Sequence, residues 1–330
     1  MATVDEEQPL VPDEHFDNDQ DSSVGDDAAS STQSLTSSLL EYRIENGRTY
    51  HAYKDGKYSL PNDDMESERL DLQHELFFRT FDGKLGLAPP NDPNYKAGRV
   101  LDLGTGTGIW AIEYGDEHPE AEVIGIDLSP SQPSCVPPNV QFQIDDIDEE
   151  WTYSIPFDFV HSRMMNSSVR DWRVYLEKCL QSLAPGGYVE VQEIDLNAKS
   201  DDETLREDSN LSRWLKLLSE ATVRLDHPYQ DIRQIKDIMA EVGFKDVTVD
   251  YFKWPTNPWP KDTKHKTLGQ WHNANIGSAL EALTLAPFTR ALGWKADEVR
   301  AFTAQVRKDL NDRRIHAYWP IVSVYGRKPA

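Results

Sequence analysis

The fold is decided by the stretch Val100-Leu101-Asp102-Leu103-Gly104-Thr105-Gly106-Thr107-Gly108. Its first four residues are mostly branched and apolar, which predicts a buried strand, and the apolar run that begins at Ile109 predicts a helix. Between the two, three glycines alternate with threonines. A glycine turn from a strand into a helix lets bare backbone approach a ligand closely, so this stretch predicts a nucleotide-type ligand at the end of the strand.

The spacing of the glycines separates two kinds of ligand. Dinucleotide enzymes favour G-x-G-x-x-G, in which the third glycine allows the helix to pack tightly on the strand. Here Ile109 occupies that third position and the third glycine is Gly108, which disfavours NAD. The spacing resembles motif I of the class I S-adenosylmethionine-dependent methyltransferases, D/E-x-G-x-G-x-G, whose loop holds the methionine part of the cofactor. The motif alone leaves open a tight turn that binds nothing.

Two segments downstream follow the order of the same family. Residues 123–127 are a short apolar run that ends in Asp127, 19 positions after Gly108, where a carboxylate can accept the ribose hydroxyls. Residues 140–144 predict a third strand, which stops at Asp145-Asp146-Ile147. The resemblance implies an acidic residue there for the adenine amino group and an apolar neighbour against the ring.

The next two segments extend the agreement. Residues 157–163 predict a fourth strand, and residues 172–183 predict a helix. The turn Leu183-Ala184-Pro185-Gly186-Gly187 then leads into a fifth strand, as it does in these methyltransferases. The resemblance therefore implies S-adenosyl-L-methionine as the cofactor, bound by Asp102, Gly104, Thr105, Gly106, Gly108, Asp127, Leu128, Asp146, Ile147 and Arg163.

Segments outside the core narrow the resemblance. Residues 40–51, 58–63 and 68–74, together with Arg314-Ile315-His316-Ala317-Tyr318, are similar to the fungal LaeA-like (TAM-domain) methyltransferases. That family includes regulators of secondary metabolism and development and enzymes encoded within metabolite gene clusters. The resemblance covers roughly residues 40–330. It implies the cofactor more directly than it implies the methyl acceptor.

The first 40 residues differ in composition from the remainder. They hold ten acids, from Asp5 to Asp27, no Lys or Arg, and a Ser/Thr run from Ser30 to Ser38. Such a stretch buries too little apolar surface to offset its ordering entropy. We expect a disordered acidic tail, acting either as a solvating segment or as a docking arm and phosphorylation target.

The charge of the chain bears on its partners. The ten tail carboxylates account for −10 of the formal net charge of −23, which leaves −13 for the remainder. Binding of a phosphate backbone needs clustered Lys and Arg, so direct nucleic-acid binding is disfavoured. The basic cluster at residues 261–266 is expected to be a solvated loop.

Several classes of protein are disfavoured by what the sequence does not contain. The N-terminus has no basic and apolar signal-peptide pattern, and no apolar run is long enough to span a bilayer. Cys135 and Cys179 make neither a disulfide framework nor a metal-ligand spacing. We expect an intracellular protein, cytoplasmic or nuclear, with no metal site.

The alternation of strands and helices predicts an α/β class I methyltransferase fold, Rossmann-like, with a seven-stranded, mostly parallel sheet and helices on both faces. Residues 41–98 are expected to form a leading segment and a cap helix at 62–81, and residues 99–330 the methyltransferase domain. The last two strands are predicted at 244–252 and 315–325. The helical insertion between them, 254–312, carries four of the nine tryptophans and is expected to be a lid over the acceptor or a cap on the sheet edge.

Methyl transfer from a sulfonium is an in-line displacement that depends on alignment and desolvation, so a dedicated base is optional. The candidates for such a base are His74, His161, Glu193 and His272, each of which could equally be a hydrogen-bonded structural residue. Arg163 is expected to order the carboxylate of the cofactor or the lid.

Two functions remain open from the sequence. The first is methyl transfer from S-adenosylmethionine to a small molecule or a protein, in fungal secondary metabolism or its regulation. The second is a cofactor-binding regulatory module that acts through protein partners in the nucleus with little or no turnover. The intact glycine loop with Asp127 and Asp146 favours the first, and the acidic tail keeps the second open.

Overall fold

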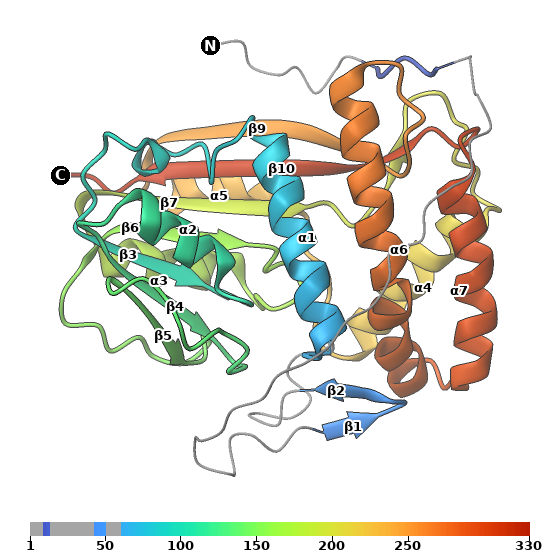
Figure 1. The fold of residues 1–330 in the computed structure, drawn as a ribbon, viewed down its shortest axis with the longest axis horizontal. Coiled ribbons are helices and arrows are strands. Elements are labelled where there is room, and N and C mark those ends of the chain that lie inside the picture. Colours follow the sequence, from blue (N-terminus) through green and yellow to red (C-terminus); the bar gives the residue numbers. More distant parts are fainter. Residues whose placement is uncertain (1–8, 14–42, 51–60) are drawn as a thin grey trace.

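The computed structural model describes residues 9–13, 43–50 and 61–330 (Figure 1). Most of the predicted tail, and part of the leading segment at 51–60, lie outside the described residues. The described part of the leading segment is a hairpin of β1 (Arg43–Glu45) and β2 (Arg48–Tyr50).

A mixed sheet forms the centre of the domain and confirms the predicted fold class (Figure 1). Five strands are parallel, and β10 runs antiparallel between β7 and β9. A two-residue strand, β8, also pairs with β10 and was not predicted. In spatial order the strands are β5 (Val140–Ile144), β4 (Glu122–Asp127), β3 (Arg99–Leu103), β6 (Phe157–Arg163), β7 (Leu183–Ile194), β10 (Ala317–Arg327) and β8 (Lys199–Ser200), with β9 (Lys245–Pro255) also paired to β10.

Alternating side chains of the strands pack under helices on both faces of the sheet. On one face Val100 and Phe159 pack against Trp110 of α2 (Ile109–Glu117). On the other face Leu101 and Val160 pack against α3 (Trp172–Ser182) and α5 (Ile235–Val242), which follows a short 3-10 turn at Ile232–Gln234. Because neighbouring strand residues point to opposite faces, both faces are filled from continuous apolar runs.

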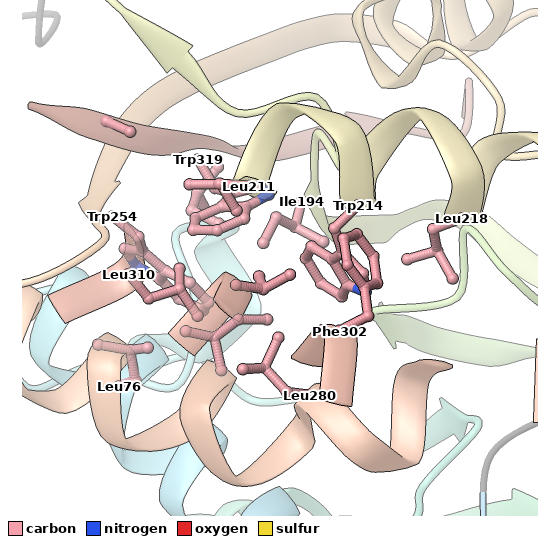
Figure 2. Close-up of a cluster of buried hydrophobic side chains, with 14 of the residues drawn as sticks. Leu76, Ile194, Leu211, Trp214, Leu218, Trp254, Leu280, Phe302, Leu310 and Trp319 are labelled. Atoms are coloured by element: carbon pink, nitrogen blue, oxygen red, sulfur yellow. The ribbon is translucent and has the colours of Figure 1, made fainter. Parts of the chain in front are cut away.

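A second group of helices packs beyond the end of the sheet, where α6 packs against α1, α4 and α7 (Figure 1). Their shared core contains Trp214, Trp254 and Trp319, and Figure 2 shows these side chains converging with leucines of the surrounding helices. The helices of this group are α1 (Asp64–Thr80), α4 (Asn210–Arg224), α6 (Thr263–Ala291) and α7 (Ala296–Asn311). Within the described residues, none of the helices has the length and apolar character needed to cross a membrane.

Several predicted boundaries differ from the structure, among them the last strand, which is predicted at 315–325 and spans Ala317–Arg327. The insertion does not begin at 254, because Trp254 and Pro255 are the last residues of β9. Helix α4 begins at Asn210, where the Ser209 side chain caps it by accepting from the Ser212 N–H. The basic cluster is not a loop, because α6 begins at Thr263 and Lys264 forms an ion pair with Asp82 at 2.6 Å.

Residues 9–13 depart from the prediction of a disordered tail. Pro12 bridges to Pro260, the Asp13 N–H donates to the Trp259 carbonyl at 2.9 Å, and the Lys261 N–H donates to the Val11 carbonyl at 2.8 Å. An ion pair joins Asp13 to Lys266 of α6. This short segment is held by backbone hydrogen bonds to residues 259–261. The prediction of disorder rested on amino-acid composition, which does not reveal such bonds.

The linker between α1 and β3 is fastened to the sheet by Glu190 of β7. The Glu190 side chain is fully buried and its carboxylate accepts hydrogen bonds from five donors. Two are backbone N–H groups of the linker. These bonds fix the position of the linker that joins α1 to the sheet. The donors are Leu87 N and Ala88 N at 2.9 Å, Asn91 Nδ2 at 2.8 Å, Gln192 Nε2 at 3.1 Å and Ser323 Oγ at 2.7 Å.

Replacing Glu190 by Ala should lower the free energy of unfolding by about 3–4 kcal/mol, because several buried donors lose their acceptor at once. Urea unfolding measured by circular dichroism tests this. The exposed Glu207→Ala serves as the matched control and should change stability by no more than about 0.5 kcal/mol. Equal stability of the two variants would mean that the linker is held by other contacts.

Candidate active site

A cavity of about 250 Å³ opens at the carboxyl ends of β3, β4, β5 and β6. This is the point where strand order reverses, since β3 pairs with β4 on one side and with β6 on the other. The cavity extends from the glycine loop to the space between α1, the end of α4 and α6. One continuous space therefore borders both the predicted cofactor loop and the insertion.

Only one of the three glycines leaves open space for a ligand. Gly106 has φ +58°, and a Cβ added there would come no closer to another residue than 3.5 Å, from Leu70 Cδ1. A Cβ on Gly104 would meet Met165 Sδ at 2.2 Å, and one on Gly108 would meet Phe142 Cζ at 2.4 Å. Gly108 thus differs from expectation: it does not line the cavity but lets α2 start against the Phe142 ring.

Asp102, on strand β3, holds the glycine loop in place by hydrogen bonds. Its carboxylate is buried, with Oδ2 accepting from the Thr105 hydroxyl at 2.6 Å and Oδ1 lying 2.7 Å from His161 Nδ1. The His161 ring stacks on Trp110 with ring centroids 3.7 Å apart and planes 5° apart. His161 therefore holds the acidic residue and the first turn of α2 in register, and its Nε2 is buried without a partner among the described residues.

The two downstream carboxylates lie where the sequence predicts them. Asp127 ends β4, where one carboxylate oxygen accepts from the Gly106 N–H and the other from the Ser129 N–H, both at 2.9 Å. Asp146 is 2% exposed and follows β5. Both line the cavity together with Leu128 and Ile147. A carboxylate oxygen has two lone pairs, so these bonds leave Asp127 able to accept from a ligand.

His74 and Arg163 belong to a chain of hydrogen bonds that ends at Glu113 of α2. Arg163 can only donate, so its contact with His74 Nδ1 at 3.0 Å makes that nitrogen the acceptor. His74 Nε2 then carries the hydrogen and donates to Glu113 Oε2 at 2.8 Å. Burial lowers the pKa of His74, against the opposing effect of Glu113, which agrees with a neutral ring.

His74 therefore departs from its expected role as a base at the pocket, because both ring nitrogens are bonded and the residue does not line the cavity. Arg163 does line the cavity, and its guanidinium lies over the Phe77 ring. Burial lowers the pKa of Arg163 to about 10, so the group stays charged at neutral pH.

Glu193 lies at the wall of the cavity with its side chain fully buried. Its Oε1 accepts from the Met165 N–H at 2.5 Å, and Oε2 has no hydrogen-bond partner among the described residues. Burial raises the pKa of Glu193 to about 8, so the carboxyl is largely protonated at neutral pH. In that form it holds the loop after β6 and is a poor proton acceptor.

His272 of α6 also borders the cavity but is held between tryptophans. Its ring centroid lies 5.2 Å from that of Trp254 and 5.0 Å from that of Trp319. Burial lowers the pKa of His272 to about 3, so the ring is neutral throughout the physiological range.

The four tryptophans of residues 254–312, the predicted insertion, are packed against other residues and do not face the cavity. Trp254 donates to the Thr80 hydroxyl at 2.8 Å and Trp259 to the Ala317 carbonyl at 2.9 Å. Trp271 lies under the Arg79 guanidinium, and Trp294 packs on Phe288.

The insertion reaches the cavity through other residues of α6. Positions 272, 275, 276, 279 and 283 recur at helical spacing and form one face, which is apolar except at its first turn. The facing wall of α1 carries Glu66, Arg69, Leu70 and Gln73 at the same spacing. Sequence analysis missed the neutral amides Gln73 and Asn275, because it weighed only titratable groups. The helical spacing of the polar residues Glu66, Arg69 and Gln73 in the predicted cap helix could have indicated that they share one face.

Within the described ranges, no group of three His, Cys, Asp or Glu side chains is placed to bind a metal ion. The groups that surround the cavity are instead suited to an organic ligand: carboxylates for hydroxyls and amines, apolar side chains for rings, and an open glycine for close approach.

Comparison with known proteins agrees with this geometry. Residues 72–249 match the methyltransferase domain family. Methyltransferase pytC of Aspergillus terreus is 40% identical over 304 residues, which cover 92% of this chain and 93% of that protein. Secondary metabolism regulator LAE1 of Cochliobolus heterostrophus is 38% identical, covering 87% of this chain and 94% of that protein.

Two further comparisons extend the picture. Secondary metabolism regulator laeA of Aspergillus flavus is 36% identical, covering 93% of this chain and 83% of that protein. Among solved structures, phosphoethanolamine N-methyltransferase 2 of Haemonchus contortus, in complex with S-adenosyl-L-methionine, is 16% identical with a TM-score of 0.45, covering 80% of this chain and 52% of that chain. The family assignment rests on the sequence relatives.

The buried carboxyl of Glu193 gives a prediction for stability against pH. Folding raises the pKa of Glu193 from 4.5 to about 8. The contribution of the protonated carboxyl to the free energy of unfolding is therefore complete below pH 4.5 and is lost as the pH rises through 8. Glu193→Gln keeps an oxygen for the Met165 N–H and cannot ionise. The melting temperature of the wild type should therefore fall relative to Glu193→Gln between pH 5 and pH 9.

Differential scanning fluorimetry across this range measures the difference, and Glu207→Gln on the surface serves as the matched control. A constant difference between wild type and Glu193→Gln would show that Glu193 is ionised in the fold at neutral pH.

Proposed function

We propose that this chain, which belongs to the methyltransferase domain family and to its fungal LaeA-like group, methylates an oxygen or nitrogen of a small, largely apolar molecule. The chain is an S-adenosylmethionine-dependent methyltransferase. The proposal concerns the acceptor and the residues that serve it. The observation that carries it is the continuity of one cavity, from the glycine loop to the apolar face of α6.

The residues of the cradle fit the cofactor. A Cβ on Gly106 would contact only Leu70, at 3.5 Å, so the loop leaves room for a ligand to pass close to the backbone. We assign the methionine part to this loop, with Arg163 available for its carboxylate. Asp127 suits the ribose hydroxyls, and Asp146 with Ile147 suits the adenine amine and ring.

S-adenosylmethionine supplies a methyl group on a sulfonium, whose departure as a neutral thioether needs no acid. The protein has to align the acceptor and exclude water, and such positioning can account for about 7–11 kcal/mol of the barrier. Two of the candidate bases, Glu193 and His272, line the cavity with buried side chains, and burial moves their pKa values to about 8 and about 3. We propose that alignment and desolvation dominate and that no dedicated base of this set is needed.

The acceptor part of the cavity favours a small molecule over a protein segment. Ile276, Ala279 and Leu283 of α6 and Leu225 after α4 give it apolar walls, and α1 closes the opposite side. Apolar walls with a few polar groups are typical of sites that enclose small ligands. Relatives named as regulators of secondary metabolism support a role in fungal secondary metabolism or its control.

The regulatory reading is less favoured by the same observation. A module that binds only the cofactor and a protein partner has no need of a second, apolar chamber beside the sulfonium. The glycine loop, Asp102 and Asp127 are also joined in one hydrogen-bonded arrangement that keeps the loop open.

Transfer of labelled methyl groups tests the proposal. Full-length protein incubated with methyl-tritiated S-adenosylmethionine and a fungal cell extract should place label in the low-mass organic fraction. Gly106→Asp should abolish this transfer. Label confined to protein bands would contradict the proposed acceptor class, and no transfer in any fraction would favour the regulatory module.

The cradle gives a graded prediction for cofactor affinity. Gly106→Asp should abolish measurable binding, because a carboxymethyl group would project into the space beside the loop and because φ +58° strains the loop once a side chain is present. Asp127→Ala should weaken binding by about 1–3 kcal/mol, because it removes charge-assisted bonds to the ribose. Isothermal titration of S-adenosylmethionine measures both, and wild-type affinity in folded Gly106→Asp would refute the cradle.

A further inference from the structure

Gln73 is a buried amide that faces the cavity without a partner. It lies on α1, is 6% exposed and lines the cavity. Its side chain makes no hydrogen bond with any residue that the structure describes, and its amide atoms are not among those sealed from open space. Buried polar side chains are nearly always paired, so a group such as this one marks a position where a ligand completes the hydrogen bonds.

Asn275 of α6 presents a second uncommitted group, and its orientation is fixed. Its Oδ1 accepts from Arg69 Nη1 at 2.9 Å, which identifies the oxygen because Arg69 can only donate. The other arm of the amide is therefore the NH₂ group, for which the described residues provide no acceptor. Asn275 is 3% exposed and lines the cavity, so it offers a positioned N–H donor.

The charge next to this donor is already neutralised. Arg69 is paired with Glu66 through three contacts of 2.7–3.1 Å, and both side chains are buried. The guanidinium therefore serves to hold Asn275 and is not free to bind an anion. What faces the ligand at this place is an amide donor and an amide that can donate or accept.

The two amides come from facing helices and border the same space. The Arg69–Asn275 bond joins α1 to α6, and Gln73 lies one turn further along α1 on the face that lines the cavity. Beyond Asn275 the face of α6 continues with Ile276 and Ala279, which are apolar. The arrangement is a neutral polar group at one end of an apolar wall.

We propose that Gln73 and Asn275 form a subsite for a neutral carbonyl or carboxamide group of the methyl acceptor, whose apolar body lies against α6. Asn275 donates to the carbonyl oxygen, and Gln73 pairs with the oxygen or with an adjacent N–H. This inference rests on the proposed function, since it names the chemistry of the molecule that occupies the acceptor chamber. A site built to hydrogen-bond a polar group rejects analogues that lack it, because its own buried groups then stay unpaired.

Three probes of matched shape test the subsite: benzamide, benzoate and toluene. Their dissociation constants are measured by ligand-observed NMR on the full chain saturated with S-adenosylhomocysteine. Benzamide should bind at least fivefold more tightly than either of the other two. Toluene leaves both amides unpaired, and benzoate loses its hydration without gaining a free cation.

Two substitutions should remove this preference. Gln73→Met keeps the shape of the side chain and removes its hydrogen bonds. Asn275→Asp keeps an oxygen for Arg69 and replaces the donor by an acceptor. In each variant the dissociation constants of benzamide and toluene should differ by no more than about twofold. Gln270→Met on the exposed face of α6 is the matched control and should keep the wild-type ratio.

Several outcomes would overturn the proposal. These are equal binding of the three probes, no binding of benzamide, tighter binding of benzoate, or a preference that survives in both variants. Titration of S-adenosylhomocysteine alone distinguishes a failure of the subsite proposal from a failure of the proposed function. If it binds normally while the probes show no preference, the subsite is wrong and the methyltransferase site stands. If one variant fails to fold, the other decides.

Discussion

The hydrogen bonds of the buried Asp102 carboxylate are the constraint on which the site depends. One oxygen holds Thr105 of the glycine loop and the other holds the His161 ring, which stacks on Trp110. Strand β3, strand β6, the loop and the first turn of α2 are thus tied at one point. These elements meet where strand order reverses, and this junction determines where on the sheet the cavity opens.

Two buried carboxyl groups of β7 show how differently the same side chain can serve a fold. Glu190 accepts from five donors and fastens the linker that carries α1. Glu193 faces the other side of the sheet with one short bond from Met165, and burial raises its pKa. Five donors make Glu190 the anchor of the linker, whereas Glu193, with its single short bond and full burial, is largely protonated at neutral pH.

The central fold, and the clustering at one cavity of the residues that we propose for the cofactor, could be predicted from the sequence because their determinants are local. Glycine spacing, strand periodicity and carboxylates at strand ends are visible within short windows, and Asp127 and Asp146 line the cavity. The acceptor end could not be predicted in the same way. Whether Trp271 faces the cavity or Arg79, and whether Gly108 faces a ligand or Phe142, depends on packing between distant segments. Backbone pairing of residues 9–13 likewise leaves no mark in composition.

The two ends of the cavity are built from different stretches of the chain. Residues 102–163 line most of the proposed cofactor end, while α1, α6 and the loop after α4 line the proposed acceptor end. Random substitution along Ile276, Ala279 and Leu283 can therefore reshape what enters the chamber while the reagent and its supporting network are untouched. In evolutionary terms the scaffold is modular: a duplicated gene could drift toward a new metabolite without first losing its chemistry, and α6 is where that drift would be recorded.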